Sequence, residues 1–357
     1  MFRPLFRRFF SRNVTPQSLA ALRDAYIRQW DESHLWQARL DGRTTTYPFL
    51  TQDSWLFTTS DIDRLVRESD QSVAHLPVDR LFLLMVRLML RVWNGGHYFL
   101  TGFTREQDHP TLFAAPGTFF QYISECKKKE QAAARMSAGD PLPSLWPSAP
   151  TDDLITARSE AAGIGCGVTI VGPRSSDGGR PVILQQRSAA TIGHVGSWSV
   201  APTFVFQPFA NRPTDENLAL SRHVYREVAE EFYGIPEPTD KSQVAEPDLI
   251  RRLRLSVESS QSQLRCVGFG LDGTNLEPNV ALLLEIRDAR LFDDIVESIQ
   301  GSWENDRIGV YSTRSEFVID RLHGLRFTCG SAFCLTRSLA LLASEEDGQQ
   351  DGDGDDA

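Results

Sequence analysis

Residues 221–235 read SRHVYREVAEEFYGI and place Glu227, Glu230 and Glu231 within five positions, next to Arg226. Residues three or four apart lie on one face of a helix, so the three carboxylates are expected to share one side of it. Arg226 precedes Glu230 by four residues and is therefore placed to pair with it. The pattern allows two interpretations: a solvated acidic helix face, or a site that holds a metal ion.

An apolar stripe completes this predicted helix. It consists of residues four apart, namely Leu220, Val224, Val228 and Phe232. We expect the helix to span 214–232 and to begin at a capping box, in which Thr214 caps and Asn217 stands where Glu or Gln is preferred. Like-charge pairs on an exposed helix cost only about 0.2–0.5 kcal/mol each. Magnesium ions, however, prefer carboxylate oxygens and typically bridge to phosphates. Local geometry therefore leaves both interpretations open.

The segments around this helix alternate between strand and helix patterns. Strands are predicted at 163–171, 181–187, 197–208, 264–273, 279–288 and 307–312. Further helices are predicted at 290–300, 315–324 and 331–344. This order predicts an α+β fold, with a mixed sheet and helices packed against it.

The chain divides into four parts on composition. The first 136 residues are expected to be mainly helical, with helices at 14–40, 77–93 and 119–136, although no motif there indicates a chemical role. The lysine run at 127–129 is expected to be a solvated helix face. Residues 137–155 are rich in Pro, Ser and Asp and are expected to form a linker. The predicted parts are thus a helical region at 1–136, a linker at 137–155, a main domain at 156–342, and an acidic disordered tail at 343–357.

Composition excludes several classes of protein. The formal net charge is −10, and the tail contributes seven of the acids, so the rest of the chain is close to neutral and no nucleic-acid partner is expected. The five cysteines have scattered spacings and are expected to be reduced thiols in a cytoplasmic protein.

Two segments bear on membranes. The most apolar segment is interrupted by Arg87 and Arg91, so no membrane span is expected. The basic, Phe-rich residues 1–13 are expected to form an N-terminal arm or first helix, with membrane-surface binding or targeting as the alternative. Nothing in the sequence indicates an oligomeric state.

The segment REVAEE, followed by Gly234 and Ile235, resembles the Nudix box, G-x5-E-x7-R-E-U-x-E-E-x-G-U, in which U is aliphatic. The resemblance, over residues 212–235, implies a Nudix-like α/β/α sandwich with a mixed sheet. It also implies a hydrolase that cleaves a nucleoside diphosphate linked to another moiety. Glu227, Glu230 and Glu231 would hold Mg²⁺ or Mn²⁺, and Arg226 would orient one of these glutamates. The general base would be one of the same glutamates, or a later one such as Glu304 or Glu316.

The box departs from the family pattern at three places. Leu218 stands where the family has an upstream glutamate, and Arg212 stands where it has its first glycine. Two residues separate Glu231 from Gly234, where the family has one. These departures favour an alternative, a Nudix-like module that binds a nucleotide or nucleotide sugar without efficient turnover. A third reading is an interaction protein whose acidic face is only solvated.

Four other polar residues are candidates for ligand contacts. His194 lies in a glycine-flanked loop and could line a pocket, although a plain turn explains it equally. His223 stands one turn before Glu227 and is expected to pair with it in solvent, with a phosphate contact as the alternative. Asp272 and Glu277 lie between two predicted strands, in a segment that is either part of a ligand pocket or an ordinary hairpin loop.

Overall fold

The computed structural model describes residues 13–73, 95–106, 109–147, 163–188, 191, 194–209, 214–235, 246–302 and 305–352. The basic N-terminal arm and the predicted helix at 77–93 lie outside these ranges. None of the described helices is both long and apolar enough to span a membrane. All five cysteines are buried free thiols.

The main sheet has nine strands and is mixed. Its order is β1-β2-β10-β11-β6-β7-β12, with β8 paired to β7 and β9 paired to β6. The pairing of β11 with β6 is parallel, whereas the other pairings in this sheet are antiparallel. The strands are β1 (Leu35–Leu40), β2 (Arg43–Leu50), β6 (Gly165–Val171), β7 (Pro181–Arg187), β8 (Trp198–Val200), β9 (Thr203–Val205), β10 (Ser262–Asp272), β11 (Pro278–Ile286) and β12 (Asn305–Ser312).

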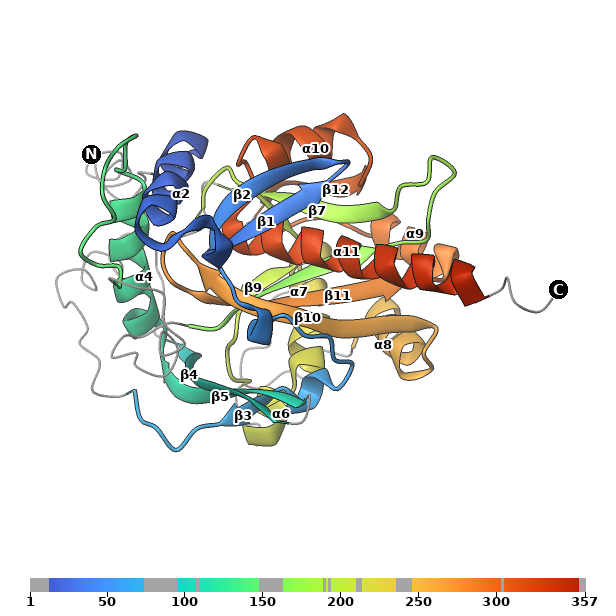
Figure 1. Ribbon diagram of the computed structural model, residues 1–357. Coiled ribbons are helices and arrows are strands. Elements are labelled where there is room, and N and C mark those ends of the chain that lie inside the picture. Colours follow the sequence, from blue (N-terminus) through green and yellow to red (C-terminus); the bar gives the residue numbers. More distant parts are fainter. Residues whose placement is uncertain are drawn as a thin grey trace, which may run out of the picture.

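Helices pack against this sheet, as the strand and helix patterns predict (Figure 1). The long helix α11 crosses β1, β2, β6, β8, β10 and β11, while α8 packs on β10 and α9 on β11. Buried Leu, Val, Ile and Phe side chains of the central strands form the core between these layers, as apolar burial requires. The helices are α2 (Pro16–Trp30), α4 (Phe119–Ala133), α6 (Thr214–Leu218), α7 (Leu220–Tyr233), α8 (Asp248–Glu258), α9 (Ala289–Glu297), α10 (Glu316–His323) and α11 (Cys329–Gly352).

The region before residue 137 corrects the expectation of a mainly helical segment. Helix α2 ends at Trp30, because the chain turns at Asp31 and continues as β1 and β2 of the main sheet. A second sheet of order β3-β5-β4 follows, made of β3 (Val66–Glu68), β5 (His109–Thr118) and β4 (Gly96–Glu106). Strand β2 pairs with β10, so strands from the first and second halves of the chain share one sheet.

The predicted linker and tail are also more ordered than expected within the described residues. Trp146 is buried, and its indole Nε1 donates to the carbonyl oxygen of Gly273 at 2.9 Å, so residues 137–147 pack on the core. Helix α11 continues to Gly352, well into the predicted tail. Glu345 pairs with Arg265, and Glu346 pairs with Arg180 at 2.6 Å. Both arginine side chains are largely buried, and a buried charge is costly unless it is paired.

Candidate functional site

Helix α7 carries the REVAEE segment and is fixed at both ends. The Ser221 backbone N–H donates to Asp63 Oδ1 at 2.8 Å, and the Ser221 hydroxyl donates to Asp63 Oδ2 at 2.8 Å. Asp63 therefore satisfies a free N–H of the first turn from a distant part of the chain. The predicted single helix is in fact two, since α6 ends at Leu218 and α7 starts at Leu220. Gly234 ends α7 in the left-handed conformation, with φ 62°, which glycine adopts without strain.

The apolar stripe of α7 faces the core, as its spacing predicts. Each of its four side chains is fully buried: Leu220, Val224, Val228 and Phe232. This orientation turns the glutamates and Arg226 toward the side of the helix where a cleft opens. The interpretation as a solvated acidic face is therefore wrong for Glu231, which is only 3% exposed.

The three glutamates have different surroundings. Glu227 Oε1 accepts from Arg226 Nη2 at 2.6 Å and from Arg226 Nε at 3.1 Å. Glu230 lies 3.8 Å from Arg226 Nε, so Arg226 contacts both residues but is closer to Glu227. Glu231 accepts from Gln185 Nε2 at 2.9 Å and from the Thr203 backbone N–H at 3.1 Å. Glu231 therefore ties α7 to strands β7 and β9.

His223 does not meet the expectation of a solvated partner for Glu227. Its ring is fully buried beside Phe206 and Phe209, with ring centroids 4.3 and 4.5 Å away, and its Nε2 lies 2.8 Å from the Asn217 carbonyl oxygen. Burial, together with the nearby Arg226 charge, lowers the pKa of His223 to about 3. The residue is therefore a neutral part of the core, and a phosphate contact is excluded by its position.

A cleft of about 790 Å³ opens beside α7, and all three glutamates line it. One wall comes from the main sheet and the loop between β10 and β11, including Arg187, Asp272 and Glu277. Another part of the lining comes from β4 and α4, including His97, Tyr122 and Lys127. The N-terminal region, to which the sequence assigned no role, thus contributes eight of the 31 residues that line the cleft.

The α4 side of the cleft carries a buried ion pair that the sequence did not predict. Lys127 Nζ lies 2.7 Å from Glu130 Oε2, and both side chains are under 10% exposed. Glu130 Oε1 also accepts from the backbone N–H of His194 at 3.1 Å, which brings His194 to the cleft. Burial alone would raise the pKa of Glu130, but Lys127 and His194 lower it below its ordinary value. The lysine run was interpreted as a solvated face, and this is wrong for Lys127 and Lys129, which are buried against the core.

Carboxyl groups outnumber basic side chains around the cleft. The lining residues include six acids, Glu130, Glu227, Glu230, Glu231, Asp272 and Glu277. They include three Lys or Arg side chains, Lys127, Arg187 and Arg226. An anionic ligand in this cleft would therefore meet net repulsion unless cations accompanied it.

The donor chemistry of this set fits a hard divalent cation such as Mg²⁺, which prefers carboxylate oxygens. The positions of these side chains do not by themselves form such a metal site. Within the ranges that the structure describes, no three His, Cys, Asp or Glu side chains come close enough together to hold a metal ion. Arg226 occupies the Glu227 carboxylate, and Glu231 is already engaged with Gln185 and Thr203. Of the two glutamates expected as general bases, Glu304 lies outside the described residues, and Glu316 starts α10 and does not line the cleft.

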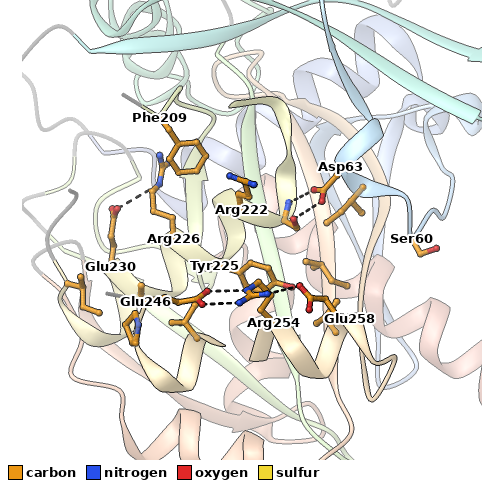
Figure 2. Close-up of a pocket in the computed structure, with 18 residues that line it drawn as sticks. Ser60, Asp63, Phe209, Arg222, Tyr225, Arg226, Glu230, Glu246, Arg254 and Glu258 are labelled. Atoms are coloured by element: carbon orange, nitrogen blue, oxygen red, sulfur yellow. Dashed lines mark hydrogen bonds and ion pairs between the residues drawn. The ribbon is translucent and has the colours of Figure 1, made fainter. Parts of the chain in front are cut away.

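A second pocket, of about 670 Å³, lies between α7 and α8 (Figure 2). Arg226 and Glu230 line both cavities and so separate them. On the α8 side, Arg254 pairs with Glu246 at 3.1 Å and with Glu258 at 2.8 Å. This pocket is lined by four acids and three arginines, so its acid excess is smaller than that of the cleft.

Comparison with known proteins adds a weak likeness. No protein-family model matches the chain, and no curated protein matches it. Among solved structures, the crystal structure of a NUDIX hydrolase from Alicyclobacillus acidocaldarius covers 43% of this chain and 80% of that chain, with 12% sequence identity and a TM-score of 0.25. This likeness identifies neither a substrate nor a metal.

Proposed function

We propose that the cleft is the active site of a Nudix-type hydrolase that cleaves a nucleoside diphosphate linked to another moiety. The observation that carries the proposal is the acid excess around one cleft that also contains the three glutamates of REVAEE. A diphosphate can enter such a cleft only together with cations, because its own charge adds to that of the carboxylates. Magnesium or manganese ions accompany nucleotide phosphates in proteins and favour the same oxygen ligands.

The residues divide between ligand contact and support. Glu227 and Glu230 would hold the metal ion, which when bound would polarise a phosphoryl oxygen and lower the pKa of a bound water. Arg226 holds the Glu227 carboxylate in place until then, at 2.6 Å. Glu231 positions α7 against β7 and β9 through Gln185 and Thr203, and also borders the cleft. Lys127 from α4 and Arg187 from β7, which both line the cleft, would supply positive charge for the phosphates.

A specific observation favours a second candidate, a module that binds the nucleotide without turning it over. The Glu227 carboxylate already accepts hydrogen bonds from Arg226, and the Glu231 carboxylate accepts them from Gln185 and Thr203. Among the described residues, no three His, Cys, Asp or Glu side chains lie close enough together to hold a metal ion. In that case Arg226 would remain on Glu227 in the bound state. Cations would then accompany the phosphates of the ligand without being bound by Glu227.

The test is to incubate the protein with Mg²⁺ or Mn²⁺ and a panel of nucleoside diphosphate conjugates, and to follow cleavage by phosphorus NMR. Glu230→Gln is the informative variant, because this side chain is 25% exposed and its replacement should leave the fold intact. Glu297→Gln is the matched control, since Glu297 is exposed on α9 and does not line the cleft. We expect metal-dependent cleavage that falls at least tenfold in Glu230→Gln only, a loss of about 1.4 kcal/mol or more in transition-state stabilisation.

The other outcomes are equally informative. If the protein binds a conjugate by calorimetry but never cleaves it, with or without metal, the second candidate replaces the first. If it neither binds nor cleaves any member of the panel, both are refuted for this ligand class.

A further inference from the structure

The loop between β10 and β11 is buried and held from several sides. Tyr26 Oη and Trp146 Nε1 both donate to the Gly273 carbonyl oxygen at 2.9 Å, and the Gly273 N–H donates to the Pro48 carbonyl oxygen at 2.8 Å. Asn275 Oδ1 accepts the backbone N–H of Glu277 at 2.9 Å. Burying polar groups is costly unless each is hydrogen-bonded. Hydrogen bonds to three other segments satisfy the polar groups of this loop, so Glu277 is held in a fixed position on the cleft.

The two oxygens of the Glu277 carboxyl group are treated differently. Oε2 accepts from Tyr122 Oη at 2.9 Å and from Asn275 Nδ2 at 3.1 Å. Oε1 makes no hydrogen bond with the residues that the structure describes. It lies over Gly165, where an added Cβ would stand only 2.3 Å away. The missing side chain at Gly165 therefore leaves room for an oxygen that borders the cleft without a partner.

We propose that Glu277 is a ligand-recognition residue of this cleft, which keeps a proton on Oε1 and donates a hydrogen bond to a phosphoryl oxygen of the bound ligand. This inference rests on the proposed function, because it requires a phosphorylated ligand in the cleft. A charged carboxylate at this position would repel a phosphate, whereas the neutral acid attracts it. The proton belongs on Oε1, since both groups that face Oε2 are donors.

The charges around Glu277 favour the protonated form. Burial is the largest cause and raises the pKa of Glu277 to about 8, and the Asp272 carboxylate adds to this effect. Hydrogen bonds from Tyr122 and Asn275 and the Arg187 charge act in the opposite direction. On β6, the Cys166 thiol is neutral, because burial, the largest cause, raises its pKa well above the ordinary value.

Binding of methylene-bridged ADP-ribose, with Mg²⁺ present, tests the inference. Its diphosphate is substituted at both ends, so it does not titrate between pH 7 and 9, and the methylene bridge prevents cleavage. If binding requires protonated Glu277, the apparent Kd of the wild type rises about tenfold over this range, in proportion to the loss of the competent form. Glu277→Gln presents an N–H in place of the O–H. It should bind within about twofold of the wild type at pH 7 and should not weaken at pH 9.

Three controls make the outcomes separable. Glu277→Ala removes the donor and should bind weakly at both pH values, while Glu297→Gln should behave as the wild type. If Glu277→Gln shows the same tenfold weakening as the wild type, the inference is overturned and the proposed function stands. If the wild type does not bind at either pH, the proposed function fails for diphosphates of this class, and the inference fails with it. Circular dichroism of each variant excludes unfolding as the cause.

Discussion

Replacing Glu277 by Gln should stabilise the protein, and the gain should grow as the pH rises. The carboxyl group has an ordinary pKa of 4.5 and a folded-state pKa of about 8, raised mainly by burial. Between these values the unfolded chain ionises Glu277 while the folded chain keeps it protonated, so the folded state binds more protons. The contribution of protonated Glu277 to stability is therefore fully present below pH 4.5 and is lost progressively as the pH rises toward 8.

The magnitude follows from the difference in pKa. Each unit of difference corresponds to about 1.4 kcal/mol, so ionisation of Glu277 in the unfolded state costs the folded protein about 3 kcal/mol at pH 7. At pH 5 the same cost is below about 1 kcal/mol. Glutamine has the same shape, can accept from Tyr122 and Asn275 through its oxygen, and does not titrate. The variant should thus gain little at pH 5 and about 3 kcal/mol at pH 7.

Urea unfolding of the wild type and of Glu277→Gln at pH 5, 7 and 8.5, followed by tryptophan fluorescence, gives the difference in the free energy of unfolding at each pH. No ligand is required, so the result is independent of the proposed function. A difference that stays constant across the three pH values would refute the reasoning, because it would show that Glu277 ionises at the same pH in both states.

Three further changes test the assignments made from the structure. Glu231→Leu should lower the free energy of unfolding by about 2–5 kcal/mol in urea, because Gln185 and the Thr203 N–H lose a buried acceptor, whereas Glu230→Gln should cost under about 1 kcal/mol. Equal losses in the two would contradict the structural role of Glu231. Gly165→Ala should cost about 1–3 kcal/mol and remove the pH dependence assigned to Glu277, since the new methyl group displaces Oε1; an unchanged profile in the same urea series would contradict the close approach. Ending the chain after Ala343 should lower the free energy of unfolding by about 1–2 kcal/mol, and with it Tm, because the buried Arg265 loses its partner Glu345. An unchanged Tm would show that the end of α11 does not contribute to stability.

Local patterns predicted most of the elements in the second half of the chain. The four-residue spacing of Leu220, Val224, Val228 and Phe232 predicts the buried face of α7, and Gly234 marks its end. The predicted strands at 163–171, 181–187 and 279–288 are observed as β6, β7 and β11. Helix α8 was not predicted, although its residues follow the same rules of spacing.

Local patterns failed where partners are remote. Strand β2 pairs mostly with β1 across the Asp41–Gly42 turn, which is a local hairpin signal. Its two-residue pairing with β10, more than two hundred residues later, has no local signal. For the same reason the sequence interpreted Lys127 as solvated, whereas it is buried against Glu130. The sequence placed the cap of this helix at Thr214. In the structure, Asp63, from a separate segment, accepts the hydrogen bond from a backbone N–H in the first turn of α7.

The sequence by itself determined the α+β class of the fold, the position and buried face of the box helix, and the grouping of its glutamates with Arg226. It could do so because hydrophobic period and side-chain spacing act within a few residues. Only the tertiary structure decided that β4 and α4 help to line the cleft, that Glu231 is a buried link to two strands, and that Tyr122 and Asn275 hold Glu277 at the cleft. These properties depend on burial and on contacts between distant segments, and burial is also what raises the pKa of Glu277.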